Sequence, residues 1–182
     1  MYHLSFERTE EQYVRFNQYH LFRKSQTLRK RLRVMRILTF IVAALWFFLA
    51  FLKIAYTEQK ATGWIFLAIA VFLLAFSLWN YSKGRINRNI QKNVHRLCVN
   101  GSYRLGTVEL CFEEDSFREQ DSQTRSENRY SSLRDICDDG VLLYLYQSET
   151  TAFIIPVGAF RSMEEKDAFL KFLSEKTNLS VQ

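Results

Sequence analysis

The sequence contains little proline, glycine and cysteine. One proline and six glycines in 182 residues leave no linker rich in either residue. The three cysteines, Cys98, Cys111 and Cys137, form no CxxC pair, which indicates free thiols in a reducing compartment rather than a disulfide framework. The GxGxxG, P-loop, HExxH and GxSxG motifs are also missing, so the sequence gives no sign of the sites that they mark. We therefore expect no enzyme activity and no cofactor.

Acidic residues are almost absent from the middle of the chain. Residues 15–104 contain 16 lysines and arginines but only one acid, Glu58, which gives this block a net charge of +15. Residues 105–182 contain 8 lysines and arginines against 15 acids, a net charge of −7. The overall charge of +6 therefore combines a basic middle with an acidic C-terminal part.

Two long apolar segments lie inside the basic block. Residues 37–56 carry one charge, Lys53, and residues 63–81 carry none. Each has about the 20 helical residues that cross a hydrocarbon core of about 30 Å, and each is apolar on all sides. Two buried core helices of a soluble protein are the alternative, but so small a chain has too little remaining protein to cover both. We therefore predict a transmembrane hairpin.

The cations beside the two segments predict its orientation. They precede the first segment and follow the second, whereas Glu58 and Lys60 cancel in the connection, so both termini are expected in the cytoplasm. Anionic lipid head groups are the expected partners of these cations, because the run lacks the interleaved aromatic residues of a nucleic-acid platform. The predicted lipid-contact residues are Arg29, Lys30, Arg31, Arg33, Arg36, Lys83, Arg85 and Arg88.

Both helices are expected to extend beyond the membrane. The segment TEEQ at residues 9–12 has the form of a capping box, and no proline or glycine follows before Tyr56. One helix is therefore expected from about residue 10 through the first span, and a second from about Gly63 to Asn100–Gly101. Apolar stripes on the two arms predict a cytoplasmic stalk, with packing on the membrane surface or the C-terminal domain as the alternative. The stripes are Leu21, Leu28, Leu32 and Met35, and Ile86, Ile90, Val94 and Leu97.

A possible metal or ligand site follows from this hairpin. If both arms are straight and the chain turns near residues 59 and 60, His20 lies near Cys98, and His95 is less than one turn from Cys98. Zinc prefers four tetrahedral nitrogen and sulfur ligands, but no fourth ligand is evident. Three separate residues packed at a helix seam are therefore the favoured interpretation, and no metal is expected.

The acidic part has the alternation of strands. TVELCF at residues 107–112, a polar stretch with a hairpin near Asp121–Ser122, and residues 141–146 and 152–155 predict an antiparallel sheet. SMEE at residues 162–165 then caps an amphipathic helix. YHLSFE at residues 2–7 also alternates, and we expect it to pair with this sheet because a lone strand is unstable.

Other residues of this part have ordinary structural interpretations. The acidic groups at Glu113–Asp115 and Asp138–Asp139 are interpreted as solvated turns. Tyr144, Tyr146, Phe153 and Phe160 are interpreted mainly as sheet core, although they could line a ligand pocket.

Several segments resemble a known family. YSSL at residues 130–133, LYLY at 143–146 and FIIPVGAF at 153–160, after a basic-flanked hairpin, resemble the YcxB-like proteins of bacteria, and residues 7–20 are also similar. The resemblance implies a membrane-anchored domain with a pleckstrin-homology-like fold, and it supplies no catalytic residues. Val157 stands where that family often has a basic residue after the proline.

The sequence thus predicts an α+β membrane protein. Residues 1–8 form the first strand of a cytoplasmic β domain, residues 9–101 the hairpin and stalk, and residues 102–182 the YcxB-like β domain, a small antiparallel sheet closed by a C-terminal helix. The expected role is a non-enzymatic, inner-membrane anchor that displays an interaction module for a protein partner or for self-association. A small membrane enzyme or transporter accessory that uses the helix seam, and an immunity or stress-response membrane protein, are the alternatives.

Overall fold

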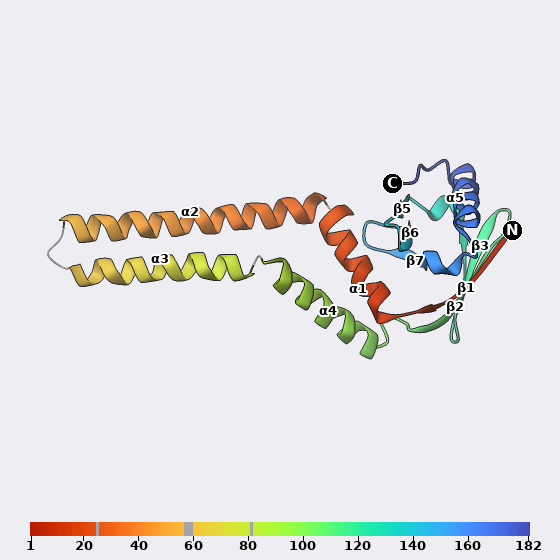
Figure 1. The fold of residues 1–182 in the computed structure, drawn as a ribbon, viewed down its shortest axis with the longest axis horizontal. Helices are drawn as coiled ribbons and strands as arrows, with labels where there is room; N and C mark the ends of the chain where they lie inside the picture. The colour runs from red at the N-terminus through yellow and green to blue at the C-terminus, as the bar shows by residue number, and fades with distance from the viewer. Residues whose placement is uncertain (25, 57–59, 81) are drawn as a thin grey trace. The chain divides into compact units, whose positions relative to one another are not determined.

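The computed structural model divides the chain into two units (Figure 1). We call Met1–Arg23 with Gln91–Gln182 the β unit and Lys24–Ile90 the hairpin unit. The structure describes residues 1–24, 26–56, 60–80 and 82–182, without the side chains of residues 26–29 and 60. The expected lipid contact of Arg29 and residue 59 of the expected turn therefore lie outside the described residues.

Seven strands in the described residues form two antiparallel sheets. The first has the order β1 (Tyr2–Arg8), β2 (Gly106–Phe112), β3 (Ser116–Gln120), β4 (Arg125–Arg129), and the second β5 (Asp135–Asp138), β6 (Leu142–Tyr146), β7 (Ala152–Pro156). The pairing of β1 with β2 confirms that the N-terminal strand returns to the C-terminal part. The single expected sheet is divided in two because a 3-10 turn, Tyr130–Ser132, separates β4 from β5 where a hairpin would have kept them paired.

The hydrophobic core lies where the inner faces of both sheets meet helix α5 (Met163–Thr177). Phe169 of α5 is fully buried, with its ring 4.8 Å from that of Phe112 on β2. The predicted cap of α5 is confirmed, since the Ser162 hydroxyl accepts the Glu165 N–H at 3.2 Å. The Glu165 carboxylate accepts the N–H of Arg161, one residue earlier than in a standard capping box.

Helix α1 (Glu10–Tyr19) covers the outer face of the second sheet. The side chains of β6 alternate, so Leu143 and Leu145 enter the core while Tyr144 and Tyr146 face the other way. Phe16 of α1 lies 5.6 Å from the Tyr144 ring and 5.9 Å from the Tyr146 ring, measured between centroids. Both tyrosines are buried, as the sequence predicted, and strand β6 is therefore covered on both faces.

The two long helices of the prediction are interrupted. The capping box at Thr9 is confirmed, but α1 is followed by a π-helix, His20–Lys24, before α2 (Gln26–Tyr56). The wider turn leaves the His20 ring 6.2 Å from both Phe16 and Tyr146. The second arm consists of α3 (Lys60–Asn80) and α4 (Lys83–Val99). Their break has a local cause, because the Ser82 hydroxyl accepts the Arg85 N–H at 3.4 Å and so caps α4.

Helix α4 ends where the sequence predicted. Gly101 has a φ of +73°, and the N–H of Ser102 bonds to the Leu97 carbonyl at 2.9 Å, as in a glycine-terminated helix. The predicted stalk is divided between the units, since Leu21, Val94 and Leu97 belong to the β unit and the remaining stripe residues to the hairpin unit. The stalk therefore stays a prediction.

Helices α2 and α3 lie side by side (Figure 1), and small residues are buried along their seam. Ala43 and Ala50 on α2, and Gly63, Ala70 and Ser77 on α3, are buried and recur every seven residues. A Cβ atom at Gly63 would lie 2.5 Å from the Ile54 side chain. Two turns of helix separate residues at this spacing, so small side chains on one stripe of each helix permit close approach.

Enlarging this seam should separate the helices. Ala70→Leu is expected to destabilise the hairpin unit by about 1–3 kcal/mol, because the added methylenes have no free space. Ala68→Leu is the control, since Ala68 lies exposed on the same helix. Unfolding in mixed detergents can be followed by the fluorescence of the tryptophans, of which Trp46 packs 5.2 Å from Phe66. Equal stability of the two variants would contradict the packing described.

Candidate functional site

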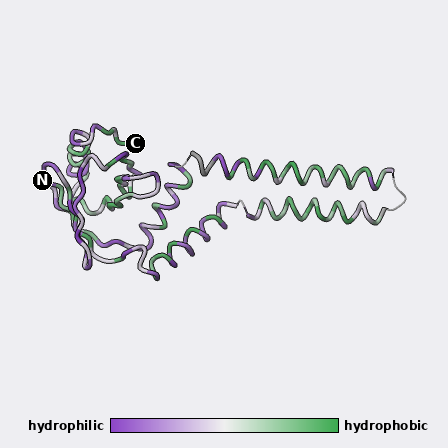
Figure 2. Tube along the Cα trace, turned by 180° about the vertical axis from the view of Figure 1, so that it is seen from behind, coloured by the Kyte–Doolittle hydropathy of each residue, from purple (hydrophilic) through white to green (hydrophobic). Residues whose placement is uncertain are grey.

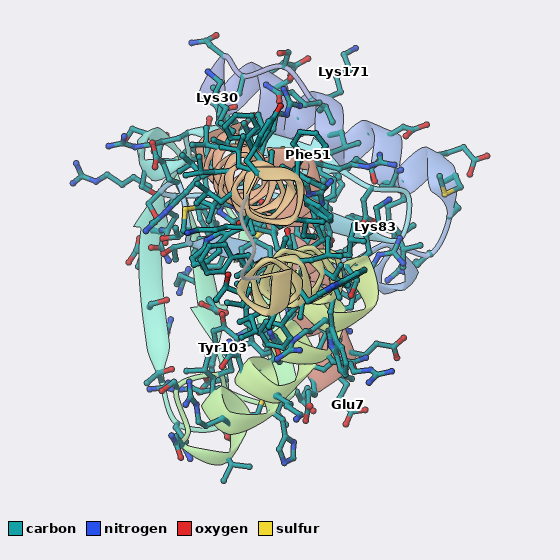
Figure 3. All side chains as sticks on the ribbon, turned by 90° about the vertical axis from the view of Figure 1, so that its left-hand side faces the viewer. Glu7, Lys30, Phe51, Lys83, Tyr103 and Lys171 are labelled. Carbon is teal, nitrogen blue, oxygen red and sulfur yellow. The ribbon has the colours of Figure 1, made fainter. Side chains whose placement is uncertain are left out.

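The hairpin unit exposes two long apolar helices. Lys30–Tyr56 and Ala61–Asn80 are long and apolar enough to cross a membrane, by length and composition. Figure 2 shows the apolar colouring along both helices, and in Figure 3 the labelled Phe51 lies on α2, where it is exposed. In the apolar 18-residue stretch of each helix, only 11% of the first and 17% of the second is buried. A core helix of a soluble protein would be mostly covered, so this surface suggests membrane association.

Cations flank this apolar surface. The described lipid-contact candidates are all exposed and belong to the hairpin unit: Lys30, Arg31, Arg33 and Arg36 on α2, and Lys83, Arg85 and Arg88 on α4. The Arg85 guanidinium lies 5.6 Å from the centre of the Trp79 ring, a cation–π contact. No acid occurs in the described part of this unit. The arrangement is therefore an apolar surface that contains one cation, Lys53, and that follows the cations of α2 and precedes those of α4 in the chain.

The three residues of the proposed seam site do not come together. His20 packs on Phe16 and Tyr146, whereas His95 lies 3.2 Å from the Glu10 carboxylate. Burial, with the negative charge of Glu10, raises the pKa of the Cys98 thiol. The described residues contain no group of three histidine, cysteine or acidic side chains that could hold a metal ion. The hypothesis assumed straight helical arms, and the π-helix and the break at Ser82 remove that assumption.

A polar cleft opens at the end of the β unit that α5 leaves uncovered. Strand β3 alternates, so Glu119 faces inward like Phe117, and the pairing places Ser126 and Asn128 of β4 on the same face. Arg8, at the end of β1, likewise continues the inward row of Leu4 and Phe6. The inner face of the first sheet thus changes from apolar to polar along its length. The cleft has a volume of about 230 Å³, and its lining residues are Arg8, Tyr13, Glu119, Ser126, Asn128, Gln147, Thr151, Ala152, Phe153 and Ile154.

A partly buried ion pair lies in this cleft. The Arg8 guanidinium donates to the Glu119 carboxylate, and the two side chains are 10% and 20% exposed. Burial alone would lower the pKa of Arg8, but the bond to Glu119 and the neighbouring Tyr13 raise it, so Arg8 stays charged. Burial raises the pKa of Tyr13, whose hydroxyl donates to the Arg104 carbonyl at 3.2 Å. The Gln147 amide donates to the Asn128 side-chain oxygen at 3.0 Å and bridges the cleft at one end.

A second polar cluster fastens α1 to the second sheet. Asp139 is not the solvated turn residue that the sequence suggested, because its side chain is 8% exposed. Its Oδ2 accepts from Arg15 Nε and from the Tyr144 hydroxyl, both at 2.8 Å. Its Oδ1 accepts the N–H groups of Val141 at 2.9 Å and Leu142 at 2.7 Å. The neighbouring Asp138 accepts from the buried Lys166 of α5 at 2.6 Å, so both carboxylates connect helices to the sheet.

The family comparison matches the same part of the molecule. The model of the family described as YcxB-like protein covers residues 112–173, from the end of β2 into α5. This segment is YcxB-like. The match confirms the resemblance carried by YSSL, LYLY and FIIPVGAF, while residues 7–20 lie outside it. Neither the curated proteins nor the solved structures gave a match to this chain. The YcxB-like segment contributes Asp139 and much of the polar cleft, whereas Arg8 and Arg15 come from outside it.

The Asp139 cluster should make α1 docking sensitive to acid. Burial raises the pKa of Asp139, but Arg15, the two N–H groups and Tyr144 together lower it below its ordinary value. A lowered pKa stabilises the fold above the unfolded value of about 3.9, and this contribution is lost as pH falls through the folded value. Asp139→Asn is therefore expected to weaken α1 docking by about 1–3 kcal/mol at neutral pH, and by much less in acid.

Hydrogen exchange of α1 amides, in detergent at neutral and acidic pH, measures this difference. Glu149→Gln, an exposed turn acid, is the control and should change little at either pH. Equal protection of α1 in Asp139→Asn and the unsubstituted chain at neutral pH would contradict the anchoring role.

Proposed function

We propose that the chain is an inner-membrane protein that displays the β unit as a binding module on the cytoplasmic side. The observation that carries the proposal is the pair of apolar helices whose side chains remain exposed. About 20 apolar helical residues match the hydrocarbon thickness of a membrane. Lipid would therefore cover the apolar side chains that the protein leaves exposed. The cations at the starts of α2 and α4 support the orientation, because lysine and arginine are retained on the cytoplasmic side.

The architecture of the β unit supports a binding role rather than a catalytic one. The two antiparallel sheets and the C-terminal helix support, at the level of their α+β architecture, the pleckstrin-homology-like module that the resemblance implied. Residues 105–182 carry a net charge of −7, so this part should repel anionic lipid, and contact with head groups is assigned to the cations of the hairpin unit. The module would then be free to bind a soluble partner, another copy of itself or a small ligand. Nucleic acid is not among the proposed partners.

Site-directed labelling tests the membrane topology. Ala61→Cys, next to the connection between the apolar helices, should react with a membrane-impermeant maleimide in intact bacterial cells. Glu149→Cys, in the exposed turn between β6 and β7, should react only after lysis. The unsubstituted chain corrects for the natural cysteines. Recovery of the chain in the supernatant after high-speed centrifugation, or equal labelling of both sites, would contradict the proposal.

Lipid retention tests the cation assignment separately. Replacing Lys30, Arg31, Arg33 and Arg36 by glutamine should lower the retention of phosphatidylglycerol, by roughly fivefold for each cation, since each contributes about 1 kcal/mol near an anionic surface. Native mass spectrometry of the chain released from mixed-lipid nanodiscs measures the bound lipid. The control replaces Arg161 and Lys171, exposed cations of the β unit. Unchanged lipid retention in the fourfold variant would remove these residues from the lipid interface.

A further inference from the structure

The polar cleft of the β unit has one cation and one anion in its lining. Arg8 and Glu119 face each other there, and the other polar lining side chains are hydroxyls and amides, which are neutral. Apolar side chains fill the same inner face further along β1 and β3, and an apolar pair of similar volume is often at least as stable as a buried ion pair. Stability alone therefore does not explain why an ion pair occupies this position.

The ion pair leaves bonding capacity unused. A guanidinium has five N–H donors and an ionised carboxylate accepts at about four positions. Glu119 accepts a hydrogen bond from Arg8, which also interacts with Tyr13, and the buried Arg8 Nε has no hydrogen-bond partner in the described part of the chain. A ligand with a carboxylate could share the Arg8 guanidinium, and a ligand with an ammonium could share Glu119. A simple anion would be repelled by Glu119, and a simple cation by Arg8.

The main chain of β7 adds acceptors and donors to the cleft. The bonds from Gln147 N to Thr151 O and from Val157 N to Val141 O mark hydrogen-bonded pairs at both ends of the β6–β7 ladder. Such pairs alternate in an antiparallel ladder, so the main-chain groups of Ala152 and Ile154 point away from β6. Both residues line the cleft. Pro156 occupies the next outward position, where a missing N–H removes no ladder bond.

The size of the cleft limits the ligand. About 230 Å³ is smaller than the roughly 300–1,000 Å³ of sites for drug-sized molecules. The bond between Gln147 and Asn128 crosses from the β6–β7 turn to β4, so an extended peptide running along β7 would have to break it. Tyr13 and Arg8 line the cleft as well. These contacts favour a short molecule over an added strand.

We infer that the cleft binds a small zwitterion of the amino-acid class, with its carboxylate on Arg8 and its ammonium on Glu119 and an outward carbonyl of β7. The site is neutral overall, so a molecule carrying both charges complements both side chains without adding net charge. This inference does not depend on membrane insertion, since all of its residues belong to the β unit.

Equilibrium dialysis of the purified full-length chain in detergent tests the inference. The probes are the free L-amino acids, each beside its N-acetyl form, which lacks the ammonium, and its methyl ester, which lacks the carboxylate. At least one free amino acid should be retained, and both blocked forms should bind about tenfold more weakly or worse. Retention of none of the free amino acids, or equal retention of a blocked form, would overturn the inference.

Two test variants, each with a control variant, locate the binding site. Ser126→Leu extends an exposed side chain on the cleft face of β4 while leaving both charges in place, and it should abolish retention. Glu127→Leu, the next residue on the opposite face of the same strand, should retain the ligand. Arg8→Met should also abolish retention, whereas Arg118→Met, which removes the pair with Glu113 on the outer face of β3, should not. Unchanged hydrogen exchange of β2 and β6 checks that the variants are folded, and undiminished binding by Ser126→Leu would place the ligand elsewhere.

Discussion

The pairing of β1 with β2 is the constraint on which the rest of the structure depends. Seven residue pairs, from Tyr2 with Phe112 to Arg8 with Gly106, join the start of the chain to a strand that follows the whole helical insertion. The entropy of closing a loop grows only with the logarithm of its length, so a ladder and its core contacts can hold even this long insertion. Arg8 and Gly106, at the two ends of the insertion, are paired residues of neighbouring strands, so the inserted chain must return to the place where it left the sheet.

The same ladder determines which residues meet in the polar cleft. Arg8 is the last residue of β1, and Thr9 caps α1 immediately after it. The chain must leave the sheet at this point, so the inward row of β1 ends in a charged residue beside the first turns of α1. Glu119 reaches Arg8 because the register pairs β1 with β2 and β2 with β3. A shift of one residue in either ladder would turn one member of the ion pair outward.

Local patterns explain how much of the fold could be predicted from the sequence. The caps at Thr9 and Ser162, the apolar segments and the alternating strands each depend on residues within a few positions of one another. The π-helix at His20–Lys24 places the His20 ring 6.2 Å from that of Tyr146 on β6, a residue far along the chain that no local pattern contains. The period of seven at Ala43, Ala50, Gly63, Ala70 and Ser77 was present in the sequence, but small residues are common enough in apolar helices to hide it.

The candidate site was harder to predict for a different reason. Strands β3 and β4 are polar on both faces, so alternation alone does not say which polar residues face inward. The single apolar residue Phe117 was the available signal, because it places Glu119, two positions later, on the core side. Asp139 gave a weaker signal in the sequence, because its partner Arg15 lies 124 residues earlier in the chain. An aspartate before a glycine is usually a turn residue, and only the tertiary fold brings the guanidinium to it.

Helix α1 connects the Asp139 cluster with the polar cleft. Arg15 and Phe16 fasten it to the second sheet, while Tyr13 lines the cleft and stacks on Tyr103 with ring centres 4.1 Å apart. A molecule bound on Arg8 would therefore touch the helix that leads, through the π-helix, into the first apolar segment. Ligand binding shifts an equilibrium only if the ligand has different affinities for the two states. Docked α1 supplies Tyr13 to the cleft and undocked α1 does not, so a ligand that contacts Tyr13 must favour docking, and docking must in turn favour the ligand.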